Sequence, residues 1–173
     1  MIRYVVIVSI VLACVGNATP AACSGGIYAQ ADHHVWKTYT NARFQYAICY
    51  PIDLLQPQGE SNNGDGEKFL AKDGAQLIVF GAYNALGDTL KDTLDKTASY
   101  LAGASGKVTY KVLRANWFVV SGQNLQAIFY AKTLYSHDQF KSFELTYRRS
   151  DASIYNPLIG RLAACFVDLG PGL

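Results

Sequence analysis

The chain has 173 residues, of which 50% are hydrophobic, and its formal net charge at pH 7 is +2. No long basic or acidic run is present, which argues against a protein that binds nucleic acid through a charged patch. Without a leader, roughly 150 residues remain, enough for one domain to fold without a metal or a disulfide.

The first 22 residues have the features of a signal sequence. Arg3 supplies a positive charge, and an apolar run of residues 4–15 follows it. The run is shorter than the roughly 20 residues that a membrane-spanning helix needs, and it fits the hydrophobic region of a cleaved secretory signal. Small residues favour cleavage after Ala18, with Ala21 and Ala22 as later alternatives.

Residues 11–14 are Val-Leu-Ala-Cys and resemble a bacterial lipobox, in which Cys14 becomes the lipidated first residue of the mature chain. Two or more acyl chains hold a protein stably on a membrane surface, whereas one does not. We therefore expect an exported protein that is periplasmic or secreted, or alternatively a lipoprotein anchored through Cys14. A membrane is expected to take part only through that anchor.

The cysteines are Cys14, Cys23, Cys49 and Cys165. Cys49 and Cys165 are the natural pair within the folded body, and an exported protein can keep such a bond. This bond would close a loop of over about 100 residues. The chain-entropy model predicts that such a bond stabilises the fold by on the order of 4–5 kcal/mol. For Cys23 three fates are open: a free thiol, a bond with Cys49, or loss with the signal.

Residues 23–35 are expected to form a flexible lead-in, followed by a single domain over residues 36–169. Residues 43–50 alternate with the two-residue period of a strand, which Pro51 ends. Residues 56–66 are dense in turn formers and are predicted to be a polar loop. Two further strands, residues 67–71 and 75–82, are joined at Asp73-Gly74 as a hairpin.

The period becomes helical over residues 88–101, with Asp88 placed to cap the helix. Four strands then form a predicted antiparallel meander, over residues 107–114, 117–121, 125–134 and 139–147. The last helix is predicted to open at Asn156-Pro157, because Asn caps helices and Pro suits the first helical position. From that helix, Cys165 would reach the strand face that Ala47 and Cys49 share.

These elements predict an α+β domain with an antiparallel sheet of about six or seven strands, flanked by helices. One helix follows the third predicted strand, and the other ends the domain.

Several short motifs carry a resemblance to a known fold class. They are Asn41-Ala42-Arg43-Phe44 with Tyr50-Pro51, Asn63-Gly64-Asp65-Gly66 with Phe69, Asp73-Gly74, Trp117-Phe118-Val119-Val120-Ser121-Gly122, Phe129-Tyr130 and Tyr155-Asn156-Pro157. Through them, the stretch from Trp36 to about Asp168 resembles bacterial exported proteins of the PsbP/Mog1-like fold class. The resemblance implies an α/β/α sandwich, and a domain that binds or helps assemble partners and lacks known catalysis.

Four residues are candidate binding residues: Asn63, Asp65, Glu67 and Asp73. Residues 61–66 resemble half of a calcium loop, but Ser61 and Lys72 stand where such a loop needs an acidic first ligand and a bidentate Glu. A tight turn, in which Asn and Asp side chains bond to the backbone, explains the segment more simply. No metal is expected, and the surface of residues 60–66 is the first to test for partner binding.

No catalytic residues are predicted. Ser136-His137-Asp138 holds the residue types of a catalytic triad, but sequence neighbours cannot form the required line of side chains, so a hairpin turn is predicted. His33 and His34 with Cys23 lack a fixed fourth metal ligand. No cofactor is expected.

The leading hypothesis is a non-enzymatic binding or assembly module of the cell envelope, which engages a protein or another envelope component. The alternative is a small exported hydrolase that uses the acidic residues of segment 60–73, since paired carboxylates can perform glycosidase chemistry.

Overall fold

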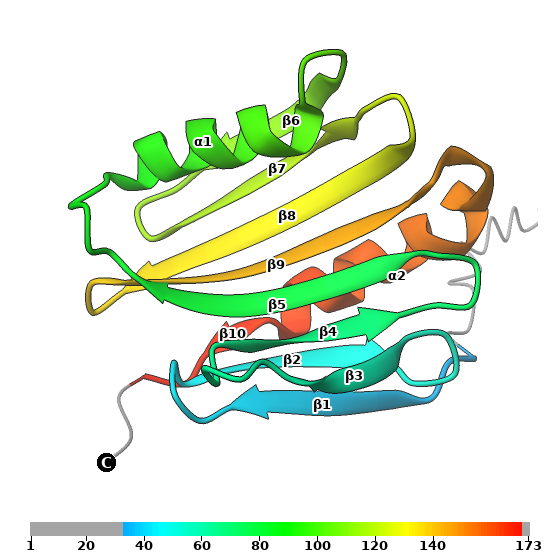
Figure 1. Cartoon of the computed structure of the whole chain (residues 1–173), viewed down its shortest axis with the longest axis horizontal. Helices are drawn as coiled ribbons and strands as arrows, with labels where there is room; N and C mark the ends of the chain where they lie inside the picture. The colour runs from blue at the N-terminus through cyan, green and yellow to red at the C-terminus, as the bar shows by residue number, and fades with distance from the viewer. Residues whose placement is uncertain (1–32, 171–173) are drawn as a thin grey trace, which may run out of the picture. The chain divides into compact units, whose positions relative to one another are not determined.

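The computed structural model describes residues 33–170, so the predicted signal sequence, Cys14 and Cys23 lie outside the described residues. Residues 33–170 form a seven-stranded and a three-stranded antiparallel sheet with two α-helices (Figure 1). The α+β class and the helices that flank the sheet are as predicted. The small second sheet was not predicted.

The larger sheet contains both predicted hairpins. In spatial order its strands are β3 (Gln56–Glu60), β4 (Gly66–Leu70), β5 (Gln76–Tyr83), β9 (Gln139–Arg148), β8 (Ala127–Ser136), β7 (Trp117–Gln123) and β6 (Lys107–Leu113). Every neighbouring pair is antiparallel, and β6 to β9 form the predicted meander. Asp73-Gly74 lies in the turn between β4 and β5, also as predicted.

The smaller sheet places β2 (Tyr46–Pro51) between β1 (Trp36–Asn41) and β10 (Val167–Asp168). All six residues of β2 are buried. Its alternation was predicted correctly, because Tyr46, Ile48 and Tyr50 join Phe44 in the core shared with the larger sheet. The strand begins at Tyr46 rather than residue 43, since the turn from β1 runs to Gln45, whose φ is 53°.

Three strands were missed: β10 has only two residues, and the side chains of β1 and β3 carry no apolar alternation. The prediction of a loop over residues 56–66 was wrong in its first half, where β3 pairs with β4 through the backbone although all five of its side chains are exposed. The strand β1 has mostly exposed or half-buried polar residues and pairs with β2 along its whole length.

Both helices begin at residues other than those predicted. α1 (Leu90–Ala102) follows the fifth strand, not the third, and Thr89 rather than Asp88 caps it through a capping box with Asp92. α2 (Ala152–Cys165) begins before Asn156 and contains Pro157. Asn156 cannot serve as a cap, because its Oδ1 accepts a hydrogen bond of 2.5 Å from the Tyr147 hydroxyl.

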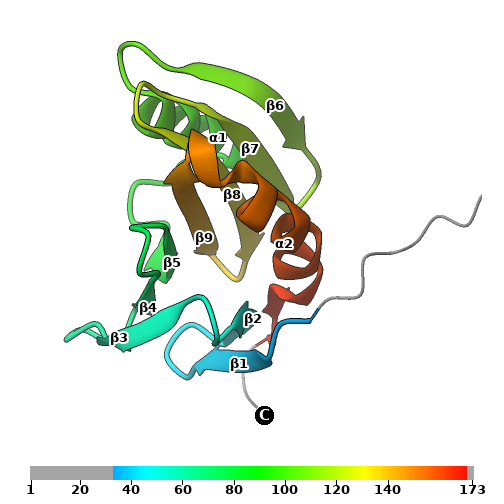
Figure 2. The same cartoon turned by 90° about the vertical axis from the view of Figure 1, so that its right-hand side faces the viewer.

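The two helices cover opposite faces of the larger sheet (Figure 2). Leu94, Ala98 and Leu101 of α1 pack against the meander. On the other face α2 contacts β2, β8 and β9, and it buries Tyr155, Leu158 and Leu162 in the main core. α2 therefore packs against both sheets.

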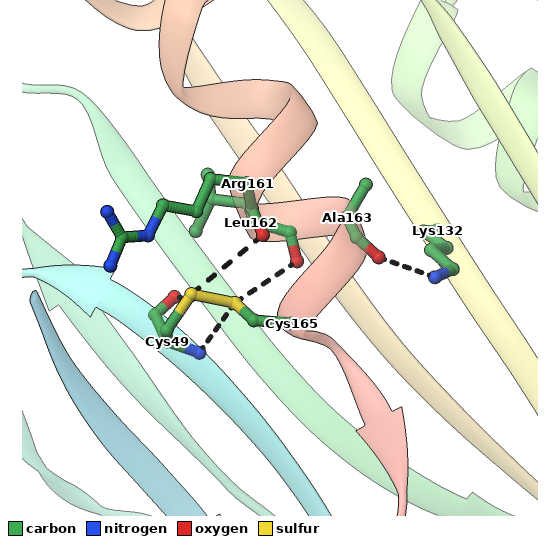
Figure 3. Close-up of a disulfide and its surroundings, with 6 residues drawn as sticks. All are labelled: Cys49, Lys132, Arg161, Leu162, Ala163 and Cys165. Carbon is green, nitrogen blue, oxygen red and sulfur yellow. Dashed lines mark hydrogen bonds between the residues drawn. A yellow bond between two sulfur atoms is a disulfide. The ribbon is translucent and has the colours of Figure 1, made fainter. Parts of the chain in front are cut away.

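A disulfide joins Cys49 of β2 to Cys165 at the end of α2, with their Cα atoms 5.7 Å apart (Figure 3). The predicted pairing is confirmed. The next residue, Phe166, packs its ring against Tyr46 at 6.0 Å and Phe143 at 5.2 Å between centroids, so it touches both sheets. The end of α2 and β10 thus connect the smaller sheet to the larger one.

Replacing both cysteines by alanine is expected to lower the free energy of unfolding by about 4 kcal/mol, because the bond closes a loop with a sequence separation of 116. Urea unfolding of the two proteins measures the difference. Reductant should destabilise the wild type and leave the double variant unchanged. A loss below about 1 kcal/mol would contradict the entropic account of this bond.

Candidate functional site

Three turns meet at one end of the sheets: residues 42–45 between β1 and β2, residues 61–65 between β3 and β4, and residues 137–138 between β8 and β9. We call these turns, with Leu169 and Gly170, the turn edge; it lies at the left of Figure 1. The Arg43 guanidinium donates to the Asn63 carbonyl, and the Leu169 N–H donates to the Gln45 carbonyl at 2.8 Å. Hydrogen bonds therefore hold the first two turns and Leu169 together.

Asn41 organises two of these turns. Its side chain is fully buried, and its Oδ1 accepts the Phe44 N–H at 2.8 Å. Its Nδ2 donates to the Gly64 carbonyl at 3.0 Å and to Glu60 Oε1 at 2.9 Å. A buried amide whose groups are all paired fixes its neighbours, since each partner left unpaired would cost free energy.

The predicted turn of residues 61–65 is confirmed in its hydrogen bonding. Ser61 Oγ donates to Asp65 Oδ1 at 2.5 Å, and Asn63 Nδ2 donates to Asp65 Oδ2 at 2.8 Å. These bonds, with that from Ser61 foremost, hold the pKa of Asp65 below its usual value. Gly64 has a φ of 68°, which favours glycine.

The other two predicted binding residues have structural partners. Glu67 is buried, and its Oε1 accepts the Gly59 N–H at 2.6 Å. Asp73 accepts the Ala75 N–H at 2.9 Å and the Tyr155 hydroxyl at 2.8 Å. Asp65 precedes β4 and Asp73 follows it, so they lie at opposite ends of that strand. Of the four predicted residues, only Asn63 and Asp65 lie at the turn edge.

A cleft of about 210 Å³ opens in the turn edge, and sequence reasoning missed it. Its lining residues come from distant parts of the chain: Arg43, Gln45, His137, Gln139, Lys141 and Gly170. His137 and Asp138 have φ values of 50° and 58°, as a two-residue hairpin turn requires. The prediction of a hairpin at Ser136-His137-Asp138 is confirmed.

A buried ion pair lies beneath this cleft. Lys141 is 1% exposed, and its Nζ donates to Asp168 and, at 3.1 Å, to Ser136 Oγ. Ser136 also donates to Asp168, as does the Gly170 N–H at 2.9 Å. Burial alone would raise the pKa of Asp168, but hydrogen bonds from Lys141 and Ser136 outweigh it and hold the pKa below its usual value.

These contacts decide what the cleft can do chemically. Ser136 donates to a carboxylate that is already paired with an ammonium, so no free base is positioned to activate its hydroxyl. Lys141 is buried, and its ammonium donates to Asp168 and Ser136 within the protein. The cleft presents the polar side chains of Arg43, Gln45, His137 and Gln139 among its lining residues.

One sequence signal pointed to this pair. Lys141 shares its face of β9 with Phe143, Leu145 and Tyr147, all of which are buried. A lysine in the alternation of a buried face needs a partner, and Asp168 is that partner.

Within residues 33–170, no group of three or more His, Cys, Asp or Glu side chains is placed to hold a metal ion. In the same part of the chain, neither helix combines the length and the apolar character that a membrane span requires.

Neither the family models nor the curated proteins contain a match to the chain. Among solved structures, it is similar to the solution structure of cyanobacterial PsbP (CyanoP) from Synechocystis sp. PCC 6803, with a TM-score of 0.60 and 14% sequence identity. The match covers 87% of this chain and 99% of that chain. The chain therefore has a PsbP-like fold, as its motifs indicated.

Asp168→Asn is expected to lower the free energy of unfolding at pH 7 by about 3 kcal/mol, because it leaves the Lys141 ammonium buried without its counter-ion. Adding Lys141→Met should restore most of that loss. Urea unfolding of the wild type, both single variants and the double variant measures the coupling. Additive losses, in which the double variant loses the sum of the two single losses, would contradict a paired role.

The loss caused by Asp168→Asn should also depend on pH. The folded pKa of Asp168 is lowered, so its carboxylate stabilises the fold above the unfolded pKa of about 4, and this contribution disappears as pH falls through the folded pKa. Unfolding measured from pH 7 towards pH 2 should show the two proteins converging. A constant difference across that range would contradict the ion pair.

Proposed function

We propose that the protein is a non-enzymatic binding or assembly module of an oxidising compartment outside the cytoplasm. It engages a protein or another envelope component through the turn edge. The observation that carries this proposal is an exposed aromatic–arginine pair beside the cleft.

That pair consists of Tyr83 and Arg43. Tyr83 is 57% exposed at the end of β5, beside Gln139 of the cleft. The Arg43 guanidinium lies 5.8 Å from its ring centroid and also lines the cleft. Tyrosine and arginine are enriched among the residues that contribute most to binding at protein interfaces. An anchor of this kind next to a polar cleft suits partner recognition.

Rigid placement supports the same role. Phe44 packs on Tyr83 at 5.0 Å and lies against Gly81, where a Cβ would come within 2.2 Å of the Phe44 ring. The pair is therefore held by a packed neighbour and by hydrogen bonds between turns. A surface ordered before binding loses less conformational entropy when a partner docks.

The disulfide supports the proposed compartment. Such bonds persist in oxidising environments and are rare where thiols are kept reduced. Together with the leader expected from residues 1–22, the Cys49–Cys165 bond supports an exported protein. Lipidation of Cys14 is proposed from the sequence of residues 11–14 alone.

The hydrolase alternative receives no support from Asp65 and Asp73, two of the acidic residues of segment 60–73. Asp65 and Asp73 stand at opposite ends of β4, and each already accepts hydrogen bonds within its own turn. Carboxylates that act on one glycosidic bond must flank it, about 5–10 Å apart. We therefore assign these residues to turn structure.

Two matched tyrosine variants test the proposal. Tyr83→Ser should lower recovery of the partner about tenfold, an effect typical of an interface anchor, when immobilised protein captures components of the native envelope. Tyr100→Ser is the control, because Tyr100 is 78% exposed but lies on α1. Mass spectrometry quantifies what is captured.

Equal capture by both variants would overturn the assignment of the turn edge. Cleavage of a glycan or peptide library by the purified protein, abolished by Asp65→Asn or Asp73→Asn, would instead support the hydrolase.

A further inference from the structure

A second surface, separate from the turn edge, lies on the α2 side of the meander. There α2 packs against β8 and β9, whereas β6 and β7 lie farther from it in the sheet (Figure 2). Strand register places two sets of side chains in rows on this side: Tyr110, Ser121 and Tyr130, then Val112, Val119 and Lys132. Trp117 and Arg114, whose guanidinium lies over the Trp117 ring, continue this surface beyond the two rows. We call Tyr110, Val112, Arg114, Trp117, Tyr130 and Lys132 the aromatic face.

The aromatic face carries cations without acidic partners. Arg114 lies 5.8 Å and Lys132 5.9 Å from the Trp117 ring centroid, and neither forms an ion pair within residues 33–170. The sequences of β6, β7, β8 and α2 contain no Asp or Glu. Asp168 approaches from β10, but it is already bonded to Lys141 and Ser136.

Lys132 is the most constrained of these cations. Its Nζ donates to the Ala163 carbonyl near the end of α2 at 2.6 Å (Figure 3). Burial lowers the pKa of Lys132, because a charge removed from water is disfavoured unless an opposite charge is near.

The edge of the sheet next to this face is open. β6 is the last strand, and five of its seven residues are exposed. At the opposite edge, β3 contains Pro57 and an irregularity in its pairing, features that block strand addition. In β6 the irregular register lies between Val108 and Tyr110, which leaves a regular edge from Tyr110 to Leu113.

A strand added beside β6 would lie about 4.8 Å from it and present every second side chain on the α2 side. Those side chains would adjoin Tyr110, which is 55% exposed, and Val112. Backbone pairing provides affinity in this mode of recognition, and the side chains of one face provide specificity. Carboxylates on that face would meet no acidic side chain of β6, β7 or β8.

We propose that the aromatic face and the free edge of β6 bind an extended acidic segment of a partner protein. The segment pairs its backbone with residues 110–113 and directs its carboxylates past Tyr110 and Val112 towards Arg114. This surface is independent of the turn edge.

The test uses the ¹⁵N-labelled protein and an N-acetylated peptide of four Glu-Val repeats. Saturable chemical-shift changes are expected at the amides of β6 and at the Trp117 indole, with weaker binding at higher salt. A peptide of four Gln-Val repeats should bind about tenfold more weakly, since each tenfold corresponds to about 1.4 kcal/mol of lost charge pairing.

Matched charge reversals locate the site. Arg114→Glu should weaken the acidic peptide about tenfold or more, whereas Lys72→Glu, an equally large change at the exposed β4–β5 turn, should alter affinity less than about twofold. Tyr110→Ser should also weaken binding of the acidic peptide. This variant removes an exposed aromatic ring of β6 and leaves the charge of the protein unchanged. Thermal unfolding of each variant confirms that it is folded.

Several results would overturn the proposal. They are the absence of saturable shifts, equal binding of the two peptides, shifts confined to the turn edge, or equal effects of Arg114→Glu and Lys72→Glu. Binding of anionic phospholipid vesicles or of polygalacturonate through Arg114, with the peptide inactive, would assign the face to a lipid or a glycan.

Discussion

The contact of the C-terminal segment with β2 is the constraint on which the rest of the structure depends. Three successive parts of this segment contact β2. Cys165 forms a disulfide with Cys49, the ring of Phe166 packs against Tyr46, and the short strand β10 pairs with β2. The same segment reaches the larger sheet through Phe143 and Lys141. The smaller sheet has only three strands, so it gains much of its stability from this attachment.

The turn edge is a consequence of that attachment. Lys141 on β9 and Gln45 beside β2 come together because Asp168 and Leu169 bond to them. The ion pair between Lys141 and Asp168 therefore acts in positioning, and in our proposal the exposed groups around the cleft contact the partner. The aromatic face differs, because Arg114 and Lys132 form no ion pair within residues 33–170. We propose both as binding surfaces of one PsbP-like fold.

The features that local pattern specifies could be predicted from the sequence. The meander and the disulfide follow from alternation, turn residues and a shared strand face, and all were found. The strand β3 was not predicted, because its residues are all exposed and it forms only through backbone pairing with β4. The cleft was missed because Arg43, His137 and Gly170 meet through tertiary contacts that no spacing along the chain reveals. Lys141 was visible as an anomaly, but its partner Asp168 was not.

Amide hydrogen exchange, compared between the oxidised protein and the Cys49→Ala/Cys165→Ala variant, tests most directly whether the C-terminal segment builds the turn edge. Loss of the bond should remove protection from the amides of Leu169 and Gly170, which bond to Gln45 and Asp168, and weaken it along β2. Amides of β7 and β8 should keep theirs, because α1 and the meander form a separate core cluster. Unchanged protection at Leu169 and Gly170, or an equal loss throughout the sheets, would contradict the account.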